Sequence, residues 1–148
     1  MKDQQQADFR GGHVAGLAAT AVLIVSAFMP WASARAGIFS VTVNGTEGDG
    51  VITMLAGMAL AIVLALNVYH VIPCMLAGIV TFIAGAIGLF VAGYDMINIS
   101  STAGAADGVS ASMEIGIILT FGAGAALMLI AWMGHHHPEA TASEEGSQ

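Results

Sequence analysis

The amino-acid sequence predicts an all-α membrane protein, an antiparallel bundle of four transmembrane helices with a small external β element from the outer loops. Two observations predict this class. The chain contains four uncharged apolar runs of 18 to 24 residues, and charged residues make up only 9% of it, against about 25% in soluble domains. So few charges cannot cover a water-exposed surface, so lipid is the expected solvent for most of it.

The apolar runs have the length and the pattern of membrane-spanning helices. At about 1.5 Å per residue they extend roughly 27 to 36 Å, enough to cross a hydrocarbon core of about 30 Å. They are apolar on all sides, whereas a helix of a water-soluble bundle keeps a polar face. A helix also satisfies its own backbone in lipid. The predicted spans, within a membrane domain of residues 1–134, are residues 14–31, 51–69, 71–94 and 115–133.

One amphipathic aromatic residue stands at the end of each run. Trp and Tyr favour the headgroup level of a bilayer, because their rings are apolar while their N–H or O–H group needs a polar partner. The sequence therefore predicts four interfacial anchors: Trp31, Tyr69, Tyr94 and Trp132.

The basic residues predict the orientation. Lys2 and Arg10 precede the first run, and the loop after the third run has no base. Because basic residues stay on the cytoplasmic side, we expect a cytoplasmic N-terminus. An even number of spans then places the C-terminus on the cytoplasmic side too. The membrane concerned is expected to be the cytoplasmic membrane. Residues 135–148 are acidic and polar, which predicts a disordered cytoplasmic tail.

A second interpretation of the N-terminus remains open. Residues 1–36 also resemble a secretory signal, with a charged start, an apolar middle and small residues from Ala32 to Ala36. Cleavage there would leave three spans. The apolar stretch is longer than the usual core of about 7 to 15 residues, and Pro30-Trp31 is typical of an interfacial anchor, so we favour an uncleaved first helix.

The outer loops contain the expected β structure. Residues 38–43 are dense in β-branched side chains and alternate apolar with hydroxyl residues, which predicts a strand. Asn44-Gly45 then predicts a turn. Residues 96–100 in the second outer loop read as a short strand. Because an isolated hairpin is marginal in water, we expect the two loops to pair.

Small residues recur at four-residue spacing within the runs. This spacing lets helix backbones approach closely in lipid, where packing drives association. It predicts helix contacts, either inside one bundle or between copies in a homo-oligomer. The residues concerned are Gly12, Gly16, Gly57, Ala61, Ala65, Ala77, Thr81, Gly85, Gly116, Thr120 and Gly124.

The sequence lacks the residues that several classes of protein function require. The spans contain no Asp, Glu, Lys, Arg or His, apart from Glu114 at the edge of the fourth, and such groups inside a membrane mark pumps and coupled transporters. We interpret Glu114 as a first-turn acid at a helix N-terminus. Three basic residues against a net charge of −7 argue against nucleic acid. The single cysteine, Cys74, excludes a CxxC site. We expect no catalytic residue, metal or cofactor.

One stretch carries a resemblance to a known type of protein. Pro30-Trp31, then residues 37–46 (GIFSVTVNGT) and 48–53 (GDGVIT) resemble a recurrent prokaryotic four-span membrane protein with a proline-tryptophan end to its first span, a short external strand and a GDG entry into its second. The resemblance covers mainly residues 28–66. It implies the four-span fold and gives no catalytic residue. The arrangement is similar to claudins in outline only, because the loop cysteine pair of claudins is missing.

The sequence thus favours a non-enzymatic membrane protein with an interaction or structural role, whose outer loops form the recognition surface. Its expected partners are the lipid bilayer and a second copy or another membrane protein. Two alternatives remain: a holin-like or small-channel pore former, which needs little beyond apolar spans that assemble, and an accessory subunit of a larger membrane complex.

Overall fold

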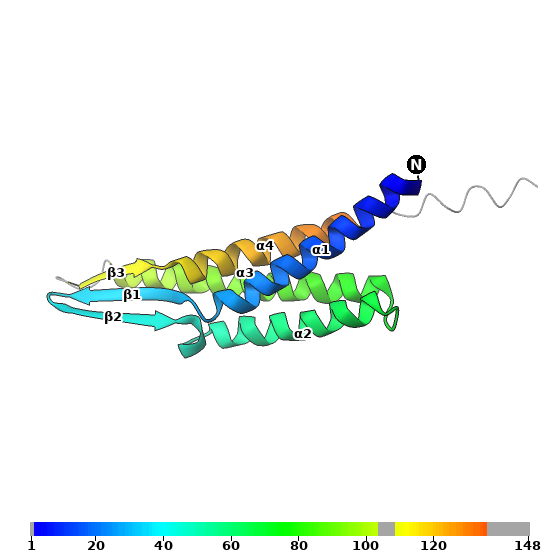
Figure 1. The fold of residues 1–148 in the computed structure, drawn as a ribbon. Helices are drawn as coiled ribbons and strands as arrows, with labels where there is room; N and C mark the ends of the chain where they lie inside the picture. The colour runs from blue at the N-terminus through cyan, green and yellow to red at the C-terminus, as the bar shows by residue number, and fades with distance from the viewer. Residues whose placement is uncertain (1, 104–108, 136–148) are drawn as a thin grey trace, which may run out of the picture.

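The described residues form four helices and one small sheet (Figure 1). The computed structural model describes residues 2–103 and 109–135, with side chains described for residues 12–101 and 110–134. The predicted combination of four helices with a small sheet is confirmed. The tail expected from residue 136 onward lies outside the described residues. In chain order the elements are α1 (Lys2–Ser26), β1 (Pro30–Ala36), β2 (Phe39–Asn44), the 3₁₀ turn η1 (Gly45–Glu47), α2 (Gly50–Val68), α3 (Cys74–Ala103), β3 (Val109–Met113) and α4 (Ile115–His135).

The helices form a bundle in which each packs on two neighbours. α1 packs on α2 and α4, and α3 packs on the same two helices. The sheet extends from one end of the bundle, and the start of α1 and the end of α4 lie at the other (Figure 1). The described ends of the chain are therefore remote from the sheet.

Within the described part of the chain, three helical stretches are long and apolar enough to cross a membrane: Gly50–Val68, Cys74–Ser101 and Ile115–Gly134. The apolar part of α1, Gly12–Ser26, is shorter, because the helix ends at Ser26 instead of continuing to Trp31. Proline has no N–H group and disfavours helical geometry in the residue before it. Pro30 therefore begins a strand.

β1 is the central strand, antiparallel to β2 on one side and to β3 on the other. The β1–β2 hairpin turns at Gly37-Ile38, where Gly37 has φ +59°, a conformation that glycine adopts without strain. The chain also turns where Asn44-Gly45 predicted a turn, since β2 ends at Asn44 and the 3₁₀ turn η1 begins at Gly45, but this turn leads to α2 and does not close the hairpin.

The strand of the second outer loop is not where the sequence suggested. Residues 96–100 belong to α3, and the strand that pairs with β1 is Val109–Met113. Met96 and Ile99 pack against a cluster of Trp31, Ala92 and Ile117. Ala92, Met96 and Ile99 have the spacing of one helix face, so tertiary burial overrides the local strand pattern. Pairing between the two outer loops is confirmed.

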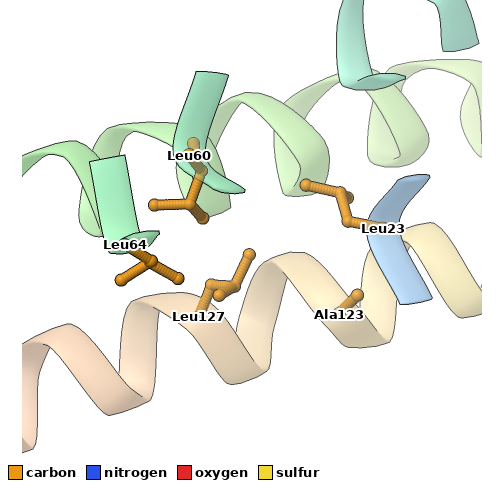
Figure 2. Close-up of a cluster of buried hydrophobic side chains, with 6 residues drawn as sticks. Leu23, Leu60, Leu64, Ala123 and Leu127 are labelled. Carbon is orange, nitrogen blue, oxygen red and sulfur yellow. The ribbon is translucent and has the colours of Figure 1, made fainter. Parts of the chain in front are cut away.

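The main core lies between the helices. Leu23 of α1, Leu60 and Leu64 of α2, and Ala123 and Leu127 of α4 point toward one another (Figure 2). Ala84 of α3 completes the cluster. Leu23, Leu60 and Leu127 are fully buried.

α3 and α4 make the most extensive helix contact, through positions without side chains. A Cβ atom added to Gly124 would lie 2.7 Å from the backbone nitrogen of Leu89 and 2.8 Å from the backbone oxygen of Gly85. Both obstacles are backbone atoms, which a rotamer change cannot move aside. Gly85 and Gly124 therefore set the distance between the two helices.

We predict that Gly124→Ala destabilises the bundle by about 1–3 kcal/mol, because α3 and α4 must separate to admit the methyl group. The measurement is equilibrium unfolding of the purified protein in mixed micelles. Gly122→Ala is the matched control on the same helix, since a Cβ there meets nothing within 4 Å, and its effect should stay within about 0.5 kcal/mol. Equal effects of the two substitutions would contradict this account of the helix contact.

Candidate functional site

The junction between bundle and sheet is organised around the indole of Trp31. Its side chain is 4% exposed, and its Nε1–H donates a hydrogen bond of 2.9 Å to the backbone oxygen of Ser26 at the end of α1. A Cβ atom on Gly45 would overlap this indole, and one on Gly116 would lie 2.7 Å from its Cδ1. Two glycines, from η1 and α4, therefore make room for the ring.

Hydroxyl groups hold α1 to α4 just below this ring. The Oγ atom of Ser26 lies 2.7 Å from Oγ1 of Thr120, and both side chains are fully buried. One of the two hydroxyls donates to the other, and the remaining one donates to a carbonyl of its own helix, Ser26 to that of Leu23 or Thr120 to that of Gly116. A helix satisfies a buried hydroxyl in this way through the carbonyl three or four residues earlier. Among the described residues no buried side-chain polar atom lacks a partner.

A second polar cluster joins the sheet to α4. Ser33 of β1 donates to Oε1 of Glu114 at 2.6 Å and lies 2.8 Å from Oγ of Ser112 in β3. The backbone N–H of Glu114 donates to the oxygen of Trp31. Glu114, expected at a helix N-terminus, does stand immediately before α4. No histidine lies in the three strands, so these hydroxyls have no imidazole base beside them within the sheet.

β2 carries an exposed apolar face. Ile38 at the hairpin tip is 95% exposed, followed by Phe39 at 74%, Val41 at 62% and Val43 at 40%. Exposure falls toward the bundle, where the sheet meets α3. The strand has neither a charged residue nor a proline.

Between this face and α3 runs a shallow apolar groove. Two adjoining hollows share Ala32, Val43 and Ile99 as lining residues. The hollow nearer the hairpin tip is also lined by Ala34 and Val41, whereas the one nearer the bundle ends at Asp49 and Asp95. The groove is therefore mainly apolar, with the polar residues Ser33, Asn44 and Asn98 also in its lining, and it is acidic at its inner end.

Asp95 lies beyond the first ~30 Å of α3, the length that the hydrocarbon core of a bilayer would cover. α3 has 30 residues, about 45 Å, which exceeds a hydrocarbon core of about 30 Å. Residues 74–94 already extend about 30 Å, and Asp95 lines a hollow together with Asp49, the residue that precedes α2. Burial raises the pKa of the Asp95 carboxyl, and the nearby negative charge of Asp49 raises it further.

The predicted packing residues fall into two groups. Ala77, Thr81 and Gly85 of α3 are buried, and so are Gly116, Thr120 and Gly124 of α4; Gly85 and Gly124 face each other in the α3–α4 contact. The remaining positions, on α1 and α2, are mixed. Gly16 is buried, and Gly57 is buried against Ile24. Ala61 is half-buried, whereas Gly12 and Ala65 are exposed.

The predicted aromatic anchors also differ in environment. Tyr69, Tyr94 and Trp132 are exposed, at 77%, 59% and 57%. Trp31 lies in a strand and is buried, with its N–H bonded to backbone. Sequence reasoning missed Ser26, Ser33 and Ser112, because the partner of each hydroxyl is remote in the chain.

The described residues contain no group of three His, Cys, Asp or Glu side chains that could hold a metal ion. Cys74 is exposed. No protein-family model matches the chain, and no curated protein matches it. The geometry of the junction and of the sheet is therefore the basis for a functional proposal.

We predict that Glu114→Ala loosens the sheet, because Ser33 loses a charge-assisted hydrogen bond of 2.6 Å. Such a loss costs about 1.5–3 kcal/mol. Amide hydrogen exchange in residues 110–113 should become faster, while exchange in α2 should be unchanged. Glu114→Gln, which keeps an acceptor oxygen, should show a smaller effect; an equal effect would show that the hydrogen bond is not what holds β3.

We predict that Asp95→Asn is at least as stable as the wild-type chain at neutral pH. A carboxyl whose pKa is raised by folding contributes stability that is lost as pH rises through its folded pKa. The advantage of Asn should therefore shrink as pH falls toward the ordinary carboxyl value. Thermal unfolding in detergent at pH 7 and at pH 4 measures it. Lower stability of Asp95→Asn at pH 7 would contradict the prediction.

Proposed function

We propose that this chain is an integral membrane protein that crosses the cytoplasmic membrane four times, with both termini cytoplasmic, and that it serves interaction and not catalysis. The observation that carries the proposal is the sheet. It extends from the bundle end remote from both described termini and exposes an uncharged apolar strand there.

The lengths of the helices support the membrane placement. From Cys74 to Tyr94, α3 extends about 30 Å, the thickness of a hydrocarbon core. Tyr69 and Trp132, near the ends of α2 and α4, then lie toward one interface, and Tyr94 lies toward the other. The apolar part of α1 is about 22 Å long, and a bilayer accommodates such a mismatch by local thinning at modest cost.

The fold also favours retention of the first helix. Cleavage near Ala34 would separate α1 from the bundle and divide β1, the strand to which both others pair. A chain cut there would lose the packing of Leu23 against α2 and α4. This supports four spans over three.

The interior of the bundle gives no support to a pore within one chain. The space between the helices is filled by Leu23, Leu60 and Leu127, each with 0% exposure, and α3 approaches α4 at backbone distance. A pore would have to form between copies, as in holins. A recognition role needs only the exposed strand that is present.

Two measurements on the full chain test the proposal. Liposomes containing the protein should retain ions and dye as well as protein-free liposomes do. In native membranes, a photo-crosslinking residue at Ile38 or Ser112 should give an adduct of discrete mass, whereas one at the lipid-facing control position Ile62 should not. Leak that rises steeply with protein density, without outer-face adducts, would overturn the interaction role in favour of a pore.

A further inference from the structure

One edge of the sheet is open. The strand order is β2-β1-β3; β3 packs along α3, whereas no helix has a comparable contact with β2. In an antiparallel hairpin with a two-residue turn, alternate residues direct their backbone groups away from the partner strand. Ala36 pairs with Phe39 across the turn, so Ser40 and Thr42 are the residues of β2 whose N–H and C=O groups face outward.

Asn44 is the next residue of β2 whose backbone N–H points away from β1, and this amide already has a partner within the chain. The N–H of Asn44 donates to Oε2 of Glu47, 3.2 Å away. The carboxylate of η1 thus satisfies the outward amide nearest the bundle. The open edge is limited to Ser40 and Thr42, the length that a strand of about five residues would cover.

This edge lacks the devices by which proteins prevent strand addition. Free edges are usually protected by lysine, proline or a bulge. The β1–β2 register shifts once, between Pro30 and Ala32 at the bundle end of β1, and is regular from Ser33 to Ala36. β2 itself holds only Ser, Thr, Asn and apolar residues. The side chains of Val41 and Val43 lie on the groove side of β2, and the backbone groups of Ser40 and Thr42 between them point away from β1. An added strand would therefore gain both hydrogen bonds and apolar contacts.

The inner end of the groove adds a charge requirement. Asp49 and Asp95 line it together, and among the described residues no basic side chain forms an ion pair with either. The one basic residue of the three strands, Arg35, lies opposite Ser40 and Ser110 in the strand register, near the hairpin tip. A cation supplied from outside would offset the repulsion between the half-buried carboxylate of Asp95 and the exposed carboxylate of Asp49.

We infer that β2 takes up an extended segment of another protein as a fourth strand, antiparallel to β2, with a basic residue at the N-terminal end of alternating apolar and hydroxyl residues. An antiparallel strand begins beside Asn44 and ends beside Phe39, so its first groove-side residue lies toward Asp49 and Asp95. The inference rests on the proposed recognition role and assigns it to this edge and this class of partner.

A second copy of the chain fits this edge less well. The strands run along the length of the bundle (Figure 1), so two copies in one membrane present β2 in the same direction. A two-fold axis along the strands would turn the two apolar faces to opposite sides. A segment of a different protein has no such restriction.

The probe for this site is a labelled pentapeptide, Lys-Thr-Val-Thr-Val, which places Lys and both Val residues on the groove side. Its control is the reversed order, Val-Thr-Val-Thr-Lys, which has the same composition but carries Lys to the hairpin tip near Arg35. Fluorescence anisotropy with the full chain in detergent measures both. We expect the first peptide to bind at least about tenfold more tightly than the second.

Substitutions at Thr42 test the backbone contact. Thr42→Pro removes an outward N–H, which an edge strand tolerates, and should weaken binding at least about tenfold; Thr42→Val keeps the N–H and should stay within about twofold. If Thr42→Pro disturbs folding, Val41→Lys serves in its place, because a cation in the groove should repel the peptide. Asp49→Asn with Asp95→Asn should remove the preference for the first peptide.

Each contrary result overturns the inference. One such result is that the two peptides bind equally well or that neither binds saturably. Another is that Thr42→Pro or Val41→Lys leaves binding unchanged in a folded chain. A third is that the effect of Thr42→Pro is to prevent the chain from associating with itself. Adducts at Ser112 without peptide binding at β2 would leave the proposed recognition role standing and place it on another surface of the sheet.

Discussion

The burial of one tryptophan determines how the two parts of this molecule join. An indole inside a protein must find space for its ring and an acceptor for its N–H. Gly45 and Gly116 provide the space, and the carbonyl of Ser26 accepts the hydrogen bond. These partners belong to η1, α4 and α1. Once the ring is fixed, β1 must leave the bundle beside the first residues of α4, and β2 must return to the start of α2.

The elements that the sequence predicted are those whose signal is local. An uncharged run of about twenty residues has few alternatives to a helix, so α2 and α4 begin and end close to the predicted boundaries. The strand at residues 39–44 also has its own alternation. The pattern is complete within each of these segments, and no remote partner is needed to interpret it.

The elements that the sequence missed depend on remote contacts. β1 consists largely of Ala and Ser between Pro30 and Ala36, a composition with weak strand propensity. It is a strand because β2 and β3 hydrogen-bond to it from both sides. Residues 96–100 alternate like a strand, yet they continue α3 because Met96 and Ile99 gain burial beside Trp31. The candidate groove follows from both facts, since β1, β2 and the end of α3 form its walls, and no one of these segments encodes it alone.

The proposed membrane placement gives the bundle and the sheet different surroundings, and this difference makes the exposed strand significant. In a bundle surrounded by lipid, the exposed Leu, Ile and Phe side chains of the helices are matched to their solvent and need no partner. The same argument does not extend to Phe39 and Val41, which lie on a strand about 20 Å long that extends from the end of the bundle. In the proposed placement they face water, and the unpaired backbone groups of Ser40 and Thr42 lie beside them. A bilayer around the helices would account for the exposed apolar side chains of the bundle but not for those of the strand, and the proposed association with another chain would satisfy both the side chains and the backbone of the strand.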